Sequence, residues 1–328
     1  MRKIKIAQIG AMHDHAPGVF PCMASYPDVF EILGYCAPDG RKPEYDYVYE
    51  GYKEYSVEEI FDIPGLEAVT IETGEHNLTK YAIEAAKRGL HIHMDKPGGI
   101  SAEEFDELIE IVKEKNLVFS MGYMYRFNPA VIEAKKLVKS GALGNIYAVE
   151  AHMDCYHPKE KRQWLEKFPG GMMFYLGCHL IDLVLQFMGQ PERIVPMNKI
   201  VGNEDTTSED YGFAMYEYKN GVSFVKTCAT EPGGYLRRQL VLCGTKGTVE
   251  IKPFEYPTKD GICTDMRVCQ STVWEDGGEK KTLGPIKRYD DMMLEFAKEI
   301  CGESKRELSL EYEKMLHKAV LKSCGINV

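Results

Sequence analysis

The sequence lacks several features that would assign it to a specialised class of protein. No apolar run approaches the length of a membrane-spanning helix, and residues 1–20 do not have the pattern of a signal peptide. The ten cysteines form no C-x-x-C pair, so their spacing predicts neither a zinc site nor a disulfide framework. We therefore expect a reduced, cytoplasmic compartment.

Excess positive charge is also missing. The 328 residues include 40 Lys and Arg against 50 Asp and Glu, which gives a formal net charge of −10. This balance argues against nucleic acids and anionic membranes as partners. The length suits two domains, and an apolar content of 44% can form a sizeable core.

The first 120 residues alternate between strand-like and helix-like patterns, which predicts an α/β fold with a doubly wound parallel sheet. The expected strands are residues 4–9, 30–37, 66–73, 91–97 and 117–124. The expected helices are residues 16–26, 56–62, 77–90 and 101–116.

The remainder of the chain has a different pattern, and we place a boundary near residue 122. Strand-like runs dominate here, which predicts a largely antiparallel sheet with a few helices. The strands are expected at residues 145–154, 193–201, 210–218, 221–230, 236–244 and 247–253. Helices are expected at 129–143 and 172–188, and a final amphipathic segment at 289–324.

The stretch KIKIAQIGAMHDHAPGVF (residues 3–20) is typical of the start of a dinucleotide site, but two of three expected glycines are missing. In the usual G-x-G-x-x-G pattern Gly10 holds the first place, Met12 the second and His15 the third. A helix N-terminus attracts phosphate through free N–H groups, and glycines only ease the approach. The candidate cofactor contacts are Gly10, Ala11, Met12, His13 and His15. An ordinary strand-to-helix turn with surface histidines explains this stretch equally well.

A second cofactor signal is an acid at the end of the second strand, which would bind the ribose hydroxyls. Asp39 is the nearest acid, two residues beyond the aligned position. Arg41 and Lys42 follow it and would suit a 2′-phosphate instead. The alternative is an ordinary Pro-Asp-Gly turn, which is the simpler interpretation of these residues alone.

Four later segments carry a stronger signal. HIHMDKPGG (residues 91–99) places Lys96 at the carboxyl end of a parallel strand, where such sheets bind ligands. It is followed by YRFNPAVIEAKKLVKSGALG, GGMMFYLGCHLIDL and RRQLVLCGTKGTVEI. In this order and spacing the segments resemble the glucose–fructose oxidoreductase and inositol dehydrogenase (Gfo/Idh/MocA) family, over nearly the whole chain.

The resemblance implies a fold and an activity. Residues 1–121 would form a Rossmann domain that binds NAD or NADP. Residues 122–328 would form an α+β domain with a large open sheet for substrate binding and oligomerisation, with the C-terminal helical segment packed back on the first domain. The implied activity is hydride transfer to or from a carbon of a sugar, polyol or related compound, by a homo-oligomer.

The resemblance also assigns residues. Lys96 matches the family's active-site lysine, His179 its catalytic histidine, and Asp182 the acid one helical turn later. Tyr175 stands where the family has an aspartate. The Thr-Pro-Asn turn after the third strand is replaced by Thr73-Gly74-Glu75, and we expect Thr73 and Glu75 to contact cofactor.

Spacing along the second predicted helix supports a site. Tyr175, His179 and Asp182 lie at i, i+4 and i+7, so an α-helix would place them on one face. We predict His179 as acid/base, Lys96 as the cation that stabilises the developing alkoxide, and Tyr175 as an alternative proton donor. The alternative is a buried histidine–aspartate pair with a structural role.

Other residues are weaker candidates for substrate contact. Tyr125 and Arg126 belong to the YRFNP segment, although Arg126 and Asn128 also suit a structural hinge. His157 follows a strand, where a surface loop is the simpler interpretation. His152 and Asp154 point away from His157 on that strand, and we predict no metal site.

We weigh three functions. The leading one is an NAD(P)-dependent dehydrogenase of a carbohydrate or polyol. A second is a redox-neutral, NAD-dependent enzyme that cleaves glycosides or eliminates a substituent. The third is a non-catalytic sugar-binding or regulatory protein, favoured by the missing glycines and the tyrosine at 175, and disfavoured by the presence of Lys96 and His179.

Overall fold

The computed structural model describes residues 1–202 and 206–328, and within it the chain forms two compact units. The first consists of Met1–Tyr123 and Arg288–His317, and the second of Met124–Lys287 and Lys318–Val328. The expected boundary near residue 122 remains a prediction about independent domains. No helix of the described residues is long and apolar enough to cross a membrane.

The first unit contains a five-stranded parallel sheet with the order β2-β1-β3-β4-β5. Chain order reverses between β1 and β3, and sheets of this kind bind ligands at the carboxyl ends of strands beside such a reversal. The strands are β1 (Ile4–Ala11), β2 (Phe30–Arg41), β3 (Ala68–Ile71), β4 (His91–Met94) and β5 (Phe119–Met121). This sheet confirms the predicted α/β class.

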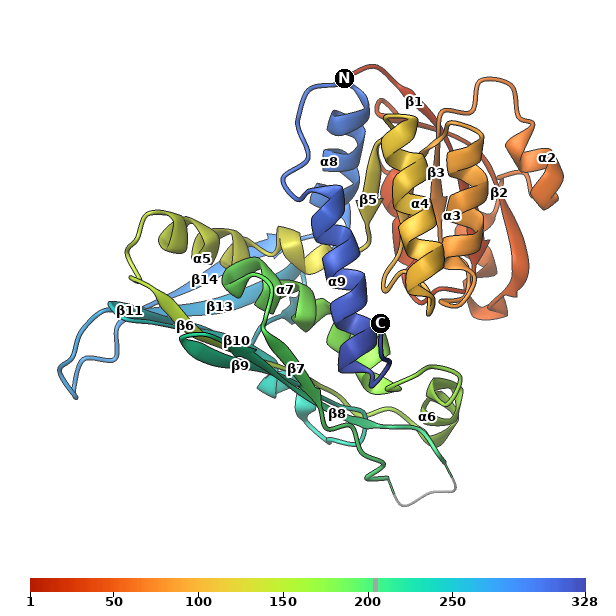
Figure 1. Cartoon of the computed structure of the whole chain (residues 1–328). Coiled ribbons are helices and arrows are strands. Elements are labelled where there is room, and N and C mark those ends of the chain that lie inside the picture. Colours follow the sequence, from red (N-terminus) through yellow and green to blue (C-terminus); the bar gives the residue numbers. More distant parts are fainter. Residues whose placement is uncertain (203–205) are drawn as a thin grey trace. The chain divides into compact units, whose positions relative to one another are not determined.

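Helices cover this sheet, and their caps follow from the sequence. Ser56 and Glu59 form a capping box, and the Ser101 hydroxyl accepts the Glu104 N–H. Figure 1 shows α3 and α4 side by side on the sheet. The helices of the unit are α1 (Ala16–Ala24), α2 (Val57–Phe61), α3 (Leu78–Lys87), α4 (Ala102–Glu114), α8 (Asp290–Ile300) and the first part of α9 (Leu310–Ser323). A 3-10 turn, η1, spans Pro43–Tyr49.

The second unit contains a nine-stranded, mostly antiparallel sheet, in which only β6 and β9 pair in parallel among the described strands. The order is β12-β13-β11-β10-β6-β9-β8-β7, with β14 also paired to β13. The bounds are β6 (Ile146–Asp154), β7 (Arg193–Pro196), β8 (Tyr211–Tyr218), β9 (Gly221–Cys228), β10 (Gln239–Gly244), β11 (Gly247–Ile251), β12 (Tyr256–Thr258), β13 (Gly261–Cys269) and β14 (Glu279–Ile286).

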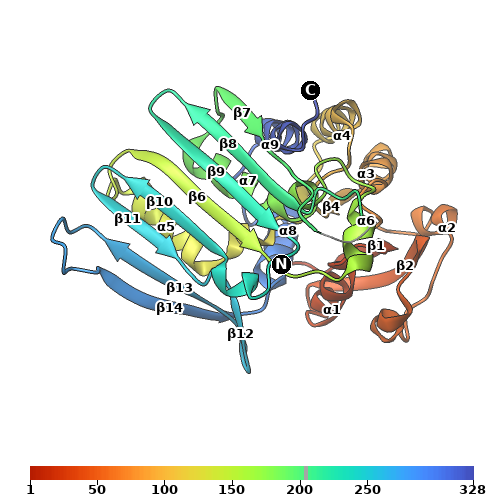
Figure 2. The ribbon, with the colours of Figure 1, turned by 90° about the horizontal axis from the view of Figure 1, so that it is seen from below.

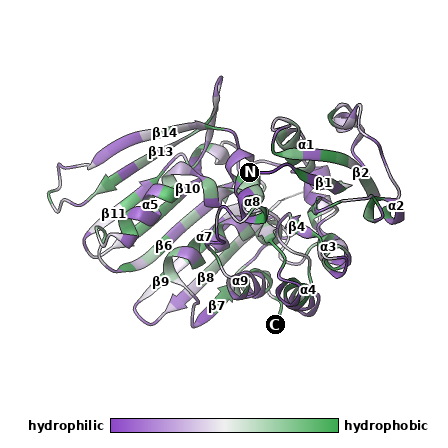
Figure 3. Cartoon of the chain, turned by 90° about the horizontal axis from the view of Figure 1, so that it is seen from above, coloured by the Kyte–Doolittle hydropathy of each residue, from purple (hydrophilic) through white to green (hydrophobic). Residues whose placement is uncertain are grey.

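Helices α5 (Pro129–Lys139) and α7 (Cys178–Met188) cover one face of the second sheet. In Figure 2 the strands lie in front of these helices, and Figure 3 shows the helices over the sheet from the other side, with mixed hydrophobic and hydrophilic colouring. Residues alternate accordingly: Ala214, Tyr216 and Val225 are fully buried. Phe213 and Phe224, on the other face of the same strands, are only partly buried. The remaining short elements are η2 (Met124–Phe127), α6 (Lys159–Leu165), η3 (Met173–Gly177), which is a π-helical turn, and η4 (Gly234–Arg237).

Candidate functional site

Gly10 lies next to the last residue of β1 and has a backbone conformation that only glycine adopts readily. Its φ is +100°, and a Cβ atom there would lie 2.3 Å from the backbone nitrogen of Thr73. The end of β1 therefore lies directly against the segment that follows β3. Gly10 is required by this close packing, whatever the turn binds.

The N–H groups just before α1 are mostly engaged, either with Glu72 or within the turn itself. Met12 and His13 donate their N–H groups to the Glu72 carbonyl oxygen at 3.2 and 3.1 Å. The His15 N–H donates to His13 Nδ1 at 3.2 Å, and the Ala16 N–H donates to the His13 carbonyl oxygen. Pro17, the next residue, has no N–H. This turn therefore offers a phosphate fewer donors than the usual glycine-rich loop does.

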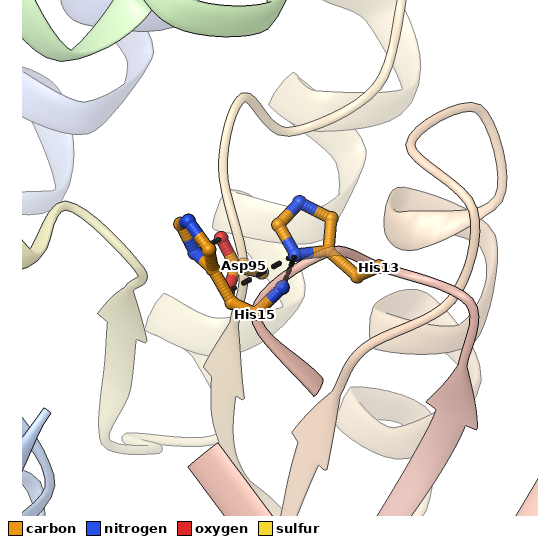
Figure 4. Close-up of side chains that lie close together, drawn as sticks. All are labelled: His13, His15 and Asp95. Carbon is orange, nitrogen blue, oxygen red and sulfur yellow. Dashed lines mark hydrogen bonds and ion pairs between the residues drawn. The ribbon is translucent and has the colours of Figure 1, made fainter. Parts of the chain in front are cut away.

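His13, His15 and Asp95 form a compact cluster beside this turn (Figure 4). His15 Nδ1 lies 3.0 Å from Asp95 Oδ2, and His13 Nδ1 lies 3.4 Å from the same oxygen. Asp95 also accepts the Lys96 N–H at 2.6 Å. His13 and Asp95 are fully buried, so a phosphate would reach His13 only after a rearrangement of the turn.

Burial sets the protonation of this cluster. It lowers the pKa of His13 to about 3, so the imidazole is neutral at pH 7. Burial also raises the pKa of Glu72 well above its usual range, and the neighbouring Asp95 carboxylate adds to this effect. For Asp95 burial acts in the same direction, but the two imidazoles and Lys96 outweigh it and hold its pKa below the usual range.

Lys96 follows β4 in a loop that the first unit holds at several points. Gly98 and Gly99 both have positive φ, and the Thr79 hydroxyl donates to the Gly98 carbonyl oxygen at 2.6 Å. His317 Nε2, from α9, lies 3.0 Å from the Gly99 carbonyl oxygen. The Lys96 side chain is buried at the carboxyl-end edge of the sheet. A loop fastened in this way gives the ammonium group a defined position.

Asp39 lies at the end of β2, close to the segment after β3. Its carboxylate accepts the Gly74 N–H at 2.9 Å and an Asn77 side-chain N–H at 2.7 Å. A carboxylate has about four lone-pair sites, so both oxygens can still accept a hydroxyl. The residues here thus fit the ribose of a dinucleotide. Of the replaced turn, the Thr73 hydroxyl donates to the Gly74 carbonyl oxygen, and Glu75 Oε1 lies 4.0 Å from His13 Nε2.

In the second unit, Tyr175 lies in the π-helical turn that precedes α7. Its ring contacts the His157 ring at a centroid distance of 6.1 Å and the Trp164 ring at 5.5 Å. The Lys161 ammonium lies 3.6 Å from the Trp164 ring centroid and 4.5 Å from that of Tyr175. These four side chains combine aromatic faces with a cation, a combination that suits a polar ring-shaped ligand.

His179 has different neighbours. Its ring, which is buried, meets the Tyr125 ring edge-on at a centroid distance of 5.0 Å. The Tyr125 hydroxyl donates to Glu255 at 2.6 Å, and Arg238 donates to the same carboxylate oxygen at 2.8 Å. This chain of contacts fixes the plane of Tyr125, which in turn fixes one side of His179.

Arg126 and Asp182 form a two-pronged ion pair. Arg126 Nε and Nη2 donate to the two Asp182 oxygens at 3.0 and 2.8 Å, and Gln186 donates to one of them. Asn128 caps α5 by accepting the N–H groups of Ala130 and Val131. The structure thus places Arg126 and Asp182 together, away from the Tyr175 contacts, and gives Asn128 a local structural role.

Two carboxyl groups of these sites were not predicted from the sequence as site residues. Glu72 directly follows β3 and has a fully buried side chain, and Asp95 lies beside the two histidines. The signal was present, because each acid directly follows an apolar strand in the sequence. The orientation of these carboxyl groups depends on tertiary packing and could not be obtained from spacing.

Two protein-family models match this chain. Residues 7–123 match the model of an oxidoreductase family with an NAD-binding Rossmann fold, and residues 131–250 match the GFO/IDH/MocA C-terminal domain. The chain belongs to the Gfo/Idh/MocA oxidoreductase family, which confirms the family expected from the sequence motifs.

Individual relatives are distant. The chain is 28% identical to the scyllo-inositol 2-dehydrogenase (NADP(+)) IolW of Bacillus subtilis (strain 168) over 166 residues, 50% of this chain and 46% of that protein. It is 29% identical to the scyllo-inositol 2-dehydrogenase (NAD(+)) of the same organism, over 59% of this chain and 57% of that protein. The matches thus span about half the length of these relatives. An oxidoreductase of Thermotoga maritima shares the fold, with a TM-score of 0.79, 17% identity, and coverage of 98% and 96% of the two chains.

Proposed function

We propose that this protein is an NAD-dependent dehydrogenase that oxidises a hydroxyl-bearing carbon of a sugar, polyol or related compound. The observation that carries the proposal is Lys96, a buried lysine held by its loop at the carboxyl end of β4. Family membership supports the same conclusion. The dinucleotide accepts hydride when it is bound, and the protein supplies position, charge and proton transfer.

Each proposed role uses a different property of the side chain. Lys96 stabilises negative charge on the substrate oxygen as its proton leaves. His179 takes that proton, a task for which an imidazole is suited near neutral pH. Tyr175 and its neighbours His157, Lys161 and Trp164 bind the substrate ring. Tyr125 orients His179, and the Arg126–Asp182 pair holds the start of this segment against α7.

For the cofactor, we propose that Asp39 binds the adenosine ribose and that Thr73, Glu75 and Lys96 lie along the dinucleotide. The turn from Gly10 through Ala11 and Met12 to His15 lies at the usual position of the diphosphate. Most N–H groups of that turn are already engaged, so it contributes less binding energy than a standard glycine-rich turn. We therefore expect weaker dinucleotide affinity than in a relative with all three glycines.

Turnover of substrate tests this proposal. Full-length protein is screened against sugars and inositols with NAD or NADP, and reduced nicotinamide is followed by absorbance. We expect Lys96→Met and His179→Gln to lower kcat/KM at least about 100-fold, with little change in the melting temperature. The exposed residues Lys115 and His76 provide matched controls, as Lys115→Met and His76→Gln.

The other outcomes of the screen are also informative. Near-normal activity in both site variants would overturn the residue assignment. Product without a net absorbance change, from protein that releases NAD on denaturation, would replace the dehydrogenase with the redox-neutral enzyme.

A second candidate function is a sugar-binding protein without turnover. The engaged N–H groups at the start of α1 favour it, because they leave the diphosphate of a dinucleotide few donors. Thermal stabilisation by a sugar, combined with none by NAD or NADP, would select this candidate over the dehydrogenase.

We further propose a cytoplasmic location and a homo-oligomer. All ten cysteines are free thiols, which suits a reducing compartment. The partly buried apolar residues on the open face of the second sheet, among them Phe213, Met215 and Phe224, support self-association through that face.

A further inference from the structure

Two buried carboxyl groups lie together in the first unit. Glu72 and Asp95 are both fully buried and interact with each other, although two carboxylates repel. His13 Nε2 is also buried and has no hydrogen-bond partner among the described residues. A polar group that is buried without a hydrogen-bond partner costs free energy, so this arrangement requires an explanation.

The groups around Glu72 are typical metal ligands. One ring nitrogen each of His13 and His15 and a carboxylate oxygen of Asp95 lie within 4.8 Å of one another (Figure 4). Asp95 Oδ2 lies 3.0 Å from His15 Nδ1 and 3.4 Å from His13 Nδ1. A tetrahedral ion with bonds of about 2.0–2.2 Å holds its ligand atoms roughly 3.3–3.6 Å apart. Little movement would therefore separate these atoms enough to surround an ion.

We propose that His13, His15 and Asp95 bind a divalent transition-metal ion of the zinc type, with Glu72 as the fourth ligand. Glu72 Oε2 lies 3.6 Å from His13 Nδ1, so its carboxyl group faces the same space. This site goes beyond the proposed dehydrogenase function and does not depend on it.

The protonation pattern of His13 suits this role. His13 Nδ1 accepts the His15 N–H, so Nδ1 is the unprotonated nitrogen and carries the lone pair that a metal needs. That hydrogen bond is long, at 3.2 Å, and the ion would replace it. His13 Nε2 then carries the proton and lies 4.0 Å from Glu75 Oε1. Metal-bound histidines commonly direct the other ring nitrogen toward a carboxylate in this way.

The ligand set also selects the class of ion. Two imidazoles and two carboxylates suit Zn²⁺, Co²⁺ and similar ions, whereas Mg²⁺ and Ca²⁺ prefer oxygen ligands alone. The Glu72 carboxyl group would complete a four-coordinate set of two nitrogen and two oxygen ligands, as is usual for zinc.

Metal binding to the full chain tests the site. Protein stripped with a chelator is titrated with Zn²⁺ against a chromophoric chelator, and with Co²⁺ by its visible absorption. We expect one ion per chain and a tetrahedral Co²⁺ spectrum. His15→Ala, Asp95→Asn and Glu72→Gln should each weaken affinity by about 10–100-fold. His76→Ala, an exposed histidine of the same unit, should bind as the wild type does.

Several results would overturn the proposal. They are the absence of a stoichiometric ion in the wild type, an octahedral Co²⁺ spectrum, or unchanged affinity in His15→Ala and Asp95→Asn. Glu72→Gln preserves the shape of the side chain and so guards against loss of binding by unfolding. Because dehydrogenase activity is not the readout, failure here leaves the proposed function untouched.

Discussion

At the scale of single residues, charge pairing at the end of β2 supports a prediction about the choice between NAD and NADP. Arg41 bonds Asp46 at 2.6 Å and is also paired with Glu54, and Lys42 is paired with Asp14. A 2′-phosphate would have to compete with these carboxylates for both cations. Asp39, by contrast, suits a free 2′-hydroxyl and repels a phosphate.

We therefore expect NAD to bind at least about tenfold more tightly than NADP, a difference of roughly 1.4 kcal/mol. Calorimetric titration with both dinucleotides measures the difference. An Asp46→Asn, Glu54→Gln double variant removes both carboxylates paired with Arg41 and should raise NADP affinity. Glu58→Gln, at an exposed acid that is not paired with Arg41, should not. Equal or tighter binding of NADP would contradict the assignment.

The spacing of residues in the sequence predicted some positions in the candidate site correctly and others not. The strand ends correctly suggested where Lys96 lies, because parallel strands present their carboxyl ends at one edge. Tyr175, His179 and Asp182 were expected on one face, but that argument assumed α-helical pitch. Tyr175 lies in a π-helical turn, and the three residues contact Trp164, Tyr125 and Arg126 respectively.

At the scale of elements, the Arg126–Asp182 pair fastens η2 to α7. The Asp182 side chain is 1% exposed and that of Arg126 is 11% exposed, so loss of one partner leaves a charge with little access to water. We expect Arg126→Met to destabilise this region by about 3–5 kcal/mol. Hydrogen exchange of α7 amides and the melting temperature measure the loss.

A surface pair provides the control. Lys87 and Glu107 are both about half exposed, and Lys87→Met should change stability little. If Arg126→Met and Lys87→Met shifted the melting temperature equally, the buried pair would have no special importance. If the buried pair matters, an Arg126→Met, Asp182→Leu double variant should be more stable than Arg126→Met alone, because it leaves no unpaired charge. If the pair has no special importance, the two variants should have the same melting temperature.

Helices and strands were predicted correctly where burial produces a regular apolar pattern in the sequence. The prediction failed for strands at the edge of the second sheet. The strands of the first sheet and β6 to β11 were expected close to their observed positions. Strands β12, β13 and β14 were not expected, nor was α6. In β14, the sequence EKKTLGPI is largely exposed and includes a proline, so no apolar alternation marks it. Strands at the edge of a sheet are specified by their partners more than by their own pattern.

At the scale of the whole molecule, buried neutral histidines predict sensitivity to acid. Burial lowers the pKa of His13 to about 3 and of His93 to about 4, from 6.5. Between these values and 6.5 the unfolded chain binds more protons, so stability falls as the pH decreases from about 6.5. Each of these two histidines should lower the free energy of unfolding by about 2 kcal/mol between neutral pH and pH 5.

Melting temperature measured from pH 8 to pH 5 checks this. His93→Phe should reduce the decline, since the His93 ring makes no hydrogen bond to the described residues and lies beside Phe296. His76→Phe, at an exposed histidine, should leave the decline unchanged. A wild-type melting temperature that is constant over this range would show that these histidines do not control acid stability.

At the same scale, the proposed self-association through the second sheet leads to a further prediction. Phe213, Met215 and Phe224 lie on the sheet face opposite the helices, with Phe213 and Phe224 stacked at 5.6 Å. We expect a mass of at least twice 37.2 kDa by light scattering. Phe224→Glu should reduce it to that of a single chain, and Lys259→Glu, in an exposed turn, should not. A monomeric wild type would refute the proposed interface.

Gly10 has an evolutionary consequence. Its hydrogen atom occupies the place where any side chain would strike the backbone of Thr73, so substitution is barred by steric overlap alone. A descendant of this protein that abandoned dinucleotides would still have to retain this residue in order to fold. The first glycine of such a fingerprint is therefore a marker of ancestry and architecture, and surveys that count it as proof of nucleotide binding will overestimate the number of working enzymes.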